Sequence, residues 1–188
     1  MYGSMQTFFH IDKKRGLNSG QVIVADASGL TPFGRLHSGR IQQAGMSYDP
    51  PFTSLIRDEM TRREYYLEAA RRMLVGEDET IYSRFSSFFC CENLESVSRM
   101  AKRMKIRPGC PIFEVETESA VSRHDMTWLD FGFPPTFAPR LHYYRAYWRG
   151  FSIDDPNVRP PGLASDHSSL FEVLIPGEVR IGRQVGRT

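Results

Sequence analysis

The sequence predicts a single α+β domain that spans residues 1–188, and three observations carry this prediction. The length of 188 residues is near the usual size of one domain and suffices for a sizeable core. Hydrophobic residues make up 40% and charged residues 24%, which is typical of globular proteins and excludes a disordered chain. The expected elements run strands, helix, strand, helix, strand, helix and two strands, an order that fits an α+β domain better than regular βαβ winding.

The first half of the chain is expected to hold two short strands, a loop and a long helix. The strands are predicted at 7–11 and 22–25, and the Gly-, Ser- and Pro-containing stretch 26–51 predicts an extended loop. Apolar residues recur at helical spacing over 52–75, which predicts the clearest helix of the sequence. Gly76 follows as its end signal.

In the second half, Asn93 predicts the N-cap of a second helix, which Pro108–Gly109 ends. A third helix is expected at 138–148, after an irregular loop at 128–139. The predicted strands of this half are 82–91, 110–117, 169–175 and 178–182. The last two are expected to form a hairpin through the turn Pro176–Gly177.

Composition narrows the function classes and the compartment. Cys90, Cys91 and Cys110 form an odd set without CxxC spacing, which argues against a disulfide framework and a cysteine zinc site. The N-terminus lacks the apolar stretch of a signal peptide, and no apolar run reaches the ~18 residues of a membrane span. We therefore expect a cytoplasmic protein with no membrane contact. The net charge of +2 does not by itself indicate nucleic-acid binding, but basic residues cluster at Lys13–Arg15, Arg99–Lys105 and Arg180–Arg187.

Three short segments stand out for chemistry. His10 lies in the first predicted strand, Ser86 and Ser87 open a middle strand, and Glu172 stands in a late strand as the first residue of EVLIP. This order resembles the ADP-ribosyltransferase superfamily, and the chain is similar to stand-alone toxin-type members from bacteria and phages. The resemblance spans residue 8 to about residue 182 and implies a split β-sandwich of two packed sheets with flanking helices.

The resemblance also implies the substrate and the site. NAD would be consumed as a substrate, no metal would be needed, and Glu172 would be the catalytic residue. A fixed carboxylate stabilises the positive charge that develops on the ribose when nicotinamide leaves, and it can orient a ribose hydroxyl or accept a proton. The expected NAD-binding residues are His10, Ser86 and Ser87, together with an aromatic side chain from Tyr65, Tyr66 or Phe88 that stacks on the nicotinamide ring. We expect His10, one of the serines and Glu172 to line one cleft.

Each of these residues also has a plain structural interpretation. His10 beside Phe8 and Phe9 fits a buried core histidine, the two serines fit exposed strand positions, and strand alternation could turn Glu172 to solvent. His124-Asp125 has the composition of half a catalytic dyad, but no nucleophile is indicated for it and a loop is expected there.

The acceptor of ADP-ribose is expected to be RNA or DNA. Transferases that modify arginine usually carry Glu or Gln two positions before the catalytic residue, where this chain has Leu170. Two stretches, the expected loop at 26–51 and the aromatic region from residue 128 onward, contain cations that could hold a phosphate backbone. These residues are Arg35, His37, Arg40, Arg140, Arg145 and Arg149. A solvated surface is the alternative for these residues. The expected setting is an intracellular toxin or antiviral defence effector that a protein antitoxin restrains.

Three other functions stay open at this point. Water could be the acceptor, which would make the protein an NAD glycohydrolase, or the acceptor could be a protein. The chain could instead be a non-catalytic module that binds nucleic acid or protein. A related RNA phosphotransferase is disfavoured because no basic phosphate pocket is evident in the sequence.

Overall fold

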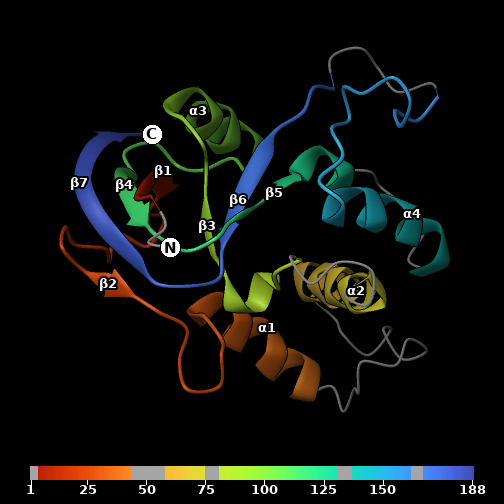
Figure 1. The fold of residues 1–188 in the computed structure, drawn as a ribbon, viewed down its shortest axis with the longest axis horizontal. Coiled ribbons are helices and arrows are strands. Elements are labelled where there is room, and N and C mark those ends of the chain that lie inside the picture. Colours follow the sequence, from red (N-terminus) through yellow and green to blue (C-terminus); the bar gives the residue numbers. More distant parts are fainter. Residues whose placement is uncertain (1–3, 44–57, 75–80, 131–136, 162–166) are drawn as a thin grey trace.

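The computed structural model describes residues 4–43, 58–74, 81–130, 137–161 and 167–188. These residues form two antiparallel sheets and four α-helices (Figure 1), in agreement with the predicted α+β class. The helices are Pro32–Gln43 (α1), Glu59–Leu74 (α2), Leu94–Arg103 (α3) and Phe137–Trp148 (α4).

The larger sheet has the strand order β1-β4-β7-β2, and its strands are Gln6–Ile11 (β1), Val22–Ile23 (β2), Pro111–Thr117 (β4) and Val179–Arg187 (β7). The smaller sheet has the order β3-β6-β5, and its strands are Phe88–Cys90 (β3), Ser122–Asp125 (β5) and Phe171–Ile175 (β6). The sheets meet at an isolated bridge, where Phe9 N–H donates to the Cys91 carbonyl at 2.9 Å and Cys91 N–H donates to the Phe9 carbonyl at 2.7 Å.

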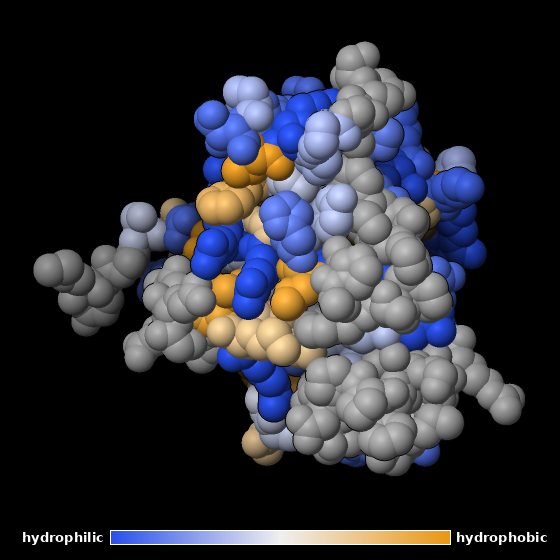
Figure 2. All heavy atoms as spheres, turned by 90° about the vertical axis from the view of Figure 1, so that its right-hand side faces the viewer, coloured by the Kyte–Doolittle hydropathy of each residue, from blue (hydrophilic) through white to orange (hydrophobic). Residues whose placement is uncertain are grey.

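Three apolar clusters hold these layers together. The first lies between the sheets and joins strands of both: Phe8, Cys90, Phe113, Val115, Val173, Ile175, Val179 and Ile181. The second packs α3 against β1 and β4 through Val97, Met100, Ile11 and Ile112. The third joins α2 and α4 to β6, and it contains both tryptophans, Trp128 and Trp148. Figure 2 shows the side of the molecule where α2 and α4 lie, with hydrophilic and hydrophobic residues in small neighbouring groups.

Two of the helix predictions agree closely with the structure. The helix expected at 138–148 is α4, and the helix expected after Asn93 is α3. The Asn93 side chain accepts the backbone N–H of Ser96 at 2.8 Å, as predicted for an N-cap. The helix expected at 52–75 is α2 over Glu59–Leu74, and the remainder of that prediction lies outside the described residues.

The prediction of a loop at 26–51 is wrong for residues 32–43, because these residues form α1. Pro32 is the first residue of this helix, where proline is well tolerated, and the Thr31 hydroxyl accepts the Gly34 N–H at 3.3 Å. A Cβ atom at Gly34 would collide with the Phe85 carbonyl, so glycine lets α1 pack directly on the chain that precedes β3. Gly34 therefore serves close packing inside a helix, although in the sequence it resembles a loop residue.

Several strand predictions need correction. In the segment 82–91, only Phe88–Cys90 is a strand, and Arg84–Ser86 forms a short 3-10 helix. Another short 3-10 helix, Met126–Leu129, occupies the start of the expected loop at 128–139, of which residues 131–136 lie outside the described residues. The expected hairpin does not form, since β6 pairs with β3 and β5 whereas β7 pairs with β4 and β2. The turn at Pro176–Gly177 therefore carries the chain from the smaller sheet to the larger one.

Candidate functional site

Glu172 lies in β6, the central strand of the smaller sheet, and only 4% of its surface is exposed. Residues of a strand alternate between its two faces, so Glu172 shares a face with Leu174, which belongs to the cluster with α2 and α4. The sheet therefore turns this carboxylate toward the helices and away from the apolar cluster between the sheets. The solvent-facing alternative for Glu172 is wrong.

Arg84 neutralises the buried carboxylate. This side chain is 5% exposed and forms an ion pair and hydrogen bond from Nη1 to Glu172 Oε1. Its Nε donates to Glu64 Oε2 at 2.7 Å, and Glu64 is 1% exposed. One guanidinium thus joins two buried carboxylates from β6 and α2. Burial opposes its charge, but Glu172 and Glu64 outweigh this effect and hold the pKa of Arg84 well above its usual value.

Tyr147 of α4 completes the group around Glu172. Its hydroxyl donates to Glu172 Oε1 at 2.5 Å and accepts from Arg84 Nη1 at 2.6 Å. Burial and the neighbouring Glu172 raise the pKa of Tyr147 well above its usual value, so the phenol stays protonated and acts as a donor. The Arg84 guanidinium also lies 4.7 Å from the ring centroid of Phe89 and 5.6 Å from that of Tyr147, within the range of cation–π attraction.

The two oxygens of Glu172 differ. Both hydrogen bonds described above end on Oε1, and within the described residues Oε2 accepts none. Among those residues, the side-chain atoms that are fully buried without a partner are Arg62 Nε and Arg63 Nε, so Oε2 keeps some contact with solvent. One oxygen is fixed and the other is available as a hydrogen-bond acceptor.

His10 lies near the bridge between the two sheets. Its Nδ1 is 2.7 Å from the Phe89 carbonyl, and because a carbonyl only accepts, Nδ1 carries the proton and Nε2 is the basic nitrogen. The ring packs against Phe88 with centroids 4.5 Å apart. Burial lowers the pKa of His10, so the ring is neutral at pH 7.

The structure does not bring His10 to Glu172. His10 shares the face of β1 with Phe8, which belongs to the cluster between the sheets, whereas Glu172 faces the helices. No hydrogen bond among the described residues joins the two side chains. The single cleft expected from the sequence is therefore not formed by their contacts, because strand alternation turns them to different sides.

The remaining predicted residues separate into two groups. The Oγ atoms of Ser86 and Ser87 donate to the Ser83 carbonyl at 3.2 and 2.7 Å, which closes the turn before β3. Tyr65 and Tyr66 are at most 1% exposed and lie in the cluster with α2 and α4, so neither offers a ring face to a ligand. Phe88 is the one candidate aromatic residue that contacts His10.

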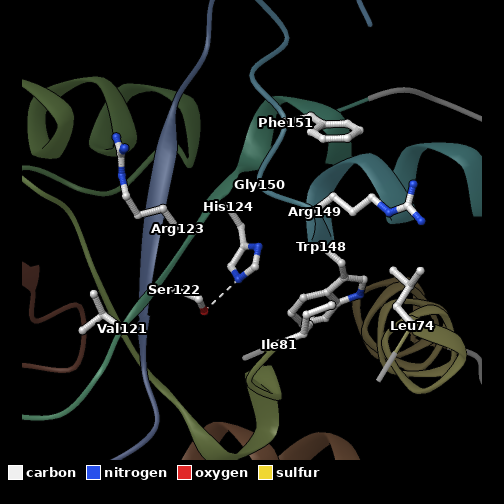
Figure 3. Close-up of a pocket in the computed structure, with 10 residues that line it drawn as sticks. All are labelled: Leu74, Ile81, Val121, Ser122, Arg123, His124, Trp148, Arg149, Gly150 and Phe151. Atoms are coloured by element: carbon white, nitrogen blue, oxygen red, sulfur yellow. Dashed lines mark hydrogen bonds between the residues drawn. The ribbon is translucent and has the colours of Figure 1, made fainter. Parts of the chain in front are cut away.

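A cavity of about 480 Å³ lies between β5 and the ends of α2 and α4 (Figure 3). Inside it, Ser122 Oγ is 2.9 Å from His124 Nε2, which places a hydroxyl beside the histidine of His124-Asp125. His124 Nδ1 donates to the Tyr147 carbonyl at 2.9 Å, and burial lowers the His124 pKa to about 4. A base this weak activates a hydroxyl poorly at neutral pH.

Asp125 does not assist that histidine. Its carboxylate accepts the backbone N–H groups of Thr127, Ile153 and Leu170, together with the Ser169 hydroxyl. These hydrogen bonds to the Asp125 carboxylate hold three segments of the chain together near the start of β6. The loop expected at His124-Asp125 is wrong, because Ser122–Asp125 forms the strand β5.

Sequence reasoning missed Arg84, Tyr147 and Glu64. Arg84 is 88 residues from Glu172 and 63 from Tyr147, so no local spacing could pair them. Within the described part of the chain, no cluster of three His, Cys, Asp or Glu side chains could hold a metal ion, and no helix is long and apolar enough to cross a membrane. No protein-family model and no curated protein matches the sequence.

Proposed function

We propose that this chain is an NAD-consuming ADP-ribosyltransferase in which Glu172 is the catalytic residue. The observation that carries the proposal is the asymmetry of this carboxylate: Arg84 and Tyr147 hold Oε1, while Oε2 has no partner in the described structure. A carboxylate fixed in this way needs no reorganisation during a reaction, which is the condition for strong electrostatic stabilisation.

The chemistry follows from that arrangement. When the bond between ribose and nicotinamide breaks, the bonding electron pair leaves with nicotinamide and positive charge develops on the ribose. Glu172 Oε2 would accept a hydrogen bond from a ribose hydroxyl and stabilise this charge. A hydroxyl or amine of the acceptor then bonds to the ribose carbon and releases a proton to the carboxylate or to water.

Arg84 and Tyr147 would act as positioning residues. The positive Arg84 pairs with Glu172 Oε1, and the Tyr147 hydroxyl donates to the same oxygen and fixes the carboxylate plane. His10 and Phe88 are both partly exposed and pack against each other, and they are proposed to bind NAD. Ser86 and Ser87 would support the chain between Arg84 and Phe88.

RNA or DNA is the proposed acceptor. Leu170, two positions before Glu172, is 4% exposed and packs in the cluster with α3, so this position offers no polar group to an arginine acceptor. An NAD glycohydrolase and a protein-modifying transferase use the same step with another acceptor. The proposed setting is a toxin or defence effector, restrained by an antitoxin.

The test is to incubate the protein with labelled NAD and a cell extract. Release of nicotinamide, with label in RNA or DNA, is the expected result, and label in protein or in free ADP-ribose would identify the other two activities. Glu172→Gln should slow nicotinamide release by about a hundredfold or more while the fold is kept. Glu178→Gln, an exposed carboxylate just past β6, is the matched control.

One observation favours a non-catalytic protein instead. Glu172 belongs to a buried ionic group, and such groups also occur purely as structural elements. Equal nicotinamide release by the Glu172→Gln and Glu178→Gln variants would favour this alternative and contradict the catalytic role.

A further inference from the structure

Most exposed cations without an acidic partner among the described residues lie on three segments of the chain. Many arginines of the described residues pair with a carboxylate, including Arg35 with Asp26, Arg123 with Glu92 and Arg183 with Glu114. Nine exposed cations form no ion pair within the described residues. Arg145 and Arg180 lie on α4 and at the start of β7, and the other seven are Lys13, Lys14, Arg15, Lys102, Lys105, Arg107 and Arg187. We call these seven residues the basic surface.

The basic surface is assembled from three distant segments that meet at Gly109. Arg187 Nη1 of β7 donates to the Gly109 carbonyl at 3.0 Å, and the Arg15 guanidinium comes within 3.5 Å of the Cβ position of Gly109. Thr188 Oγ1 donates to the Arg107 carbonyl at 3.0 Å. The end of β1, the segment before β4 and the end of β7 therefore bring their cations to the same side.

The acidic residue within this region turns inward. Asp12 is 4% exposed, and its two oxygens accept the backbone N–H groups of Lys14 and Leu17 at 3.1 and 2.8 Å. Asp12 thus shapes the loop that presents the lysines, while the exposed side chains around it are positive.

The backbone gives a second, independent observation. Among the described residues, Arg15 (φ 56°) and Lys105 (φ 49°) are the non-glycine residues with positive φ, and both belong to the basic surface. Lys105 follows the C-cap Met104, and Ile106 N–H donates to the Ala101 carbonyl at 2.9 Å. Glycine is the favoured residue at such a helix end. At both positions glycine would adopt the positive φ at a lower cost in free energy than arginine or lysine does. The presence of a cation there indicates that its charge has a use.

We propose that the basic surface binds the phosphate backbone of a nucleic acid. Several unpaired cations on one side can each displace counterions from a polyanion, which gives strong and salt-dependent association. Contacts from lysine and arginine to phosphate groups carry no information about the bases, so we expect the binding to be independent of sequence.

This surface differs from the one expected from the sequence. Arg35 pairs with Asp26, Arg40 pairs with Asp58, and His37 is 1% exposed and bonded to Thr61. These three residues therefore already have partners within the chain. Binding at the basic surface needs neither NAD nor Glu172, so it stands apart from the proposed transfer reaction.

Fluorescence anisotropy with a labelled single-stranded RNA of about 20 nucleotides tests the proposal, with duplex DNA of the same length as a second probe. Affinity should fall as salt rises from about 0.05 to 0.2 M. The triple variant Lys13→Gln, Lys14→Gln, Arg107→Gln should bind at least about tenfold more weakly and show a shallower salt dependence. The control triple Arg35→Gln, Arg123→Gln, Arg183→Gln removes the same charge from ion-paired sites and should stay within about twofold of the wild type.

Lys105→Gly separates binding from folding. This variant should raise the melting temperature, because glycine suits the positive φ, and yet weaken RNA binding. Glu172→Gln should bind RNA as the wild type does, even if it has no transferase activity. Equal losses in the two triple variants, no binding at about 0.05 M salt, or binding of anionic lipid vesicles in place of both nucleic acids would overturn the proposal.

Discussion

Arg84 is the residue on which the buried ionic group depends. It is the shared partner of Glu64 and Glu172, so its removal leaves two buried carboxylates without their common cation. We expect Arg84→Met to lower the free energy of unfolding by about 3–5 kcal/mol, the cost of leaving buried charges unpaired. Glu172→Gln should cost about 1–2 kcal/mol, because Glu64 still balances Arg84. Urea unfolding measures both values, and a smaller loss for Arg84→Met than for Glu172→Gln would contradict this assignment.

Three histidines with a lowered pKa predict how stability depends on pH. Burial lowers the pKa of His10 and His37 below 6.5 and that of His124 to about 4. Between these values the unfolded chain binds protons that the folded chain does not, so folding stability is complete above pH 6.5 and falls as the pH drops toward 4. His124 alone should contribute about 3 kcal/mol of this loss.

Urea unfolding at a series of pH values checks this prediction. His124→Asn should flatten the pH profile, whereas His142→Gln, a change at an exposed position of α4, should leave its shape unchanged. A wild-type stability that is constant from pH 6.5 to 4.5 would show that the histidines are not buried as described.

For single residues, the sequence could identify Glu172 as a candidate site residue but could not predict which side chains surround it. EVLIP marked a carboxylate in a late strand, and the structure places it in the central strand of the smaller sheet. The partners Arg84 and Tyr147 come from a 3-10 helix and from α4, far away in sequence. Only the packing of α4 against the sheet brings them to Glu172, and periodicity carries no information about that packing.

Among the elements, α3 depends on its N-cap residue Asn93, which can be recognised from the sequence alone. The Asn93 side chain accepts the Ser96 N–H at 2.8 Å and satisfies one of the free donors of the first turn. Asn93→Ala should therefore lower the free energy of unfolding by about 1 kcal/mol. Ser98→Ala, at an exposed position inside the same helix, should change it by less than about 0.5 kcal/mol. Thermal unfolding of the two variants makes the comparison, and equal melting temperatures would contradict the capping role.

The elements that the sequence could not predict depend on distant contacts. The helix α1 contains Pro32 and Gly34, which resemble loop residues, and the close approach of Gly34 to Phe85 is a contact between distant segments. The strand β5 is the polar run SRHD, whose pairing partner β6 lies beyond α4. Pro176–Gly177 correctly marked a turn, but a turn signal does not state whether the next strand joins the same sheet.

At the scale of the whole molecule, a backbone bridge and a shared apolar cluster join the two sheets in the described part of the chain. The bridge links Phe9 and Cys91, and the cluster includes residues from β1, β4, β7, β3 and β6. Because both sheets contribute to one core, neither can lose its packing without exposing the other. The predicted single domain therefore requires one cooperative unfolding transition.

Ile181→Ala tests this cooperativity. Ile181 has no exposed surface and lies in β7 in the cluster between the sheets, whereas Trp128 and Trp148 belong to the cluster with α2 and α4. The substitution should lower the free energy of unfolding by about 2–5 kcal/mol. Tryptophan fluorescence reports the helical cluster and far-ultraviolet circular dichroism reports all elements, so a single domain requires the urea midpoints of both signals to fall together. A fluorescence midpoint that stays in place while the dichroism midpoint falls would mean that the sheets and the helical layer unfold separately.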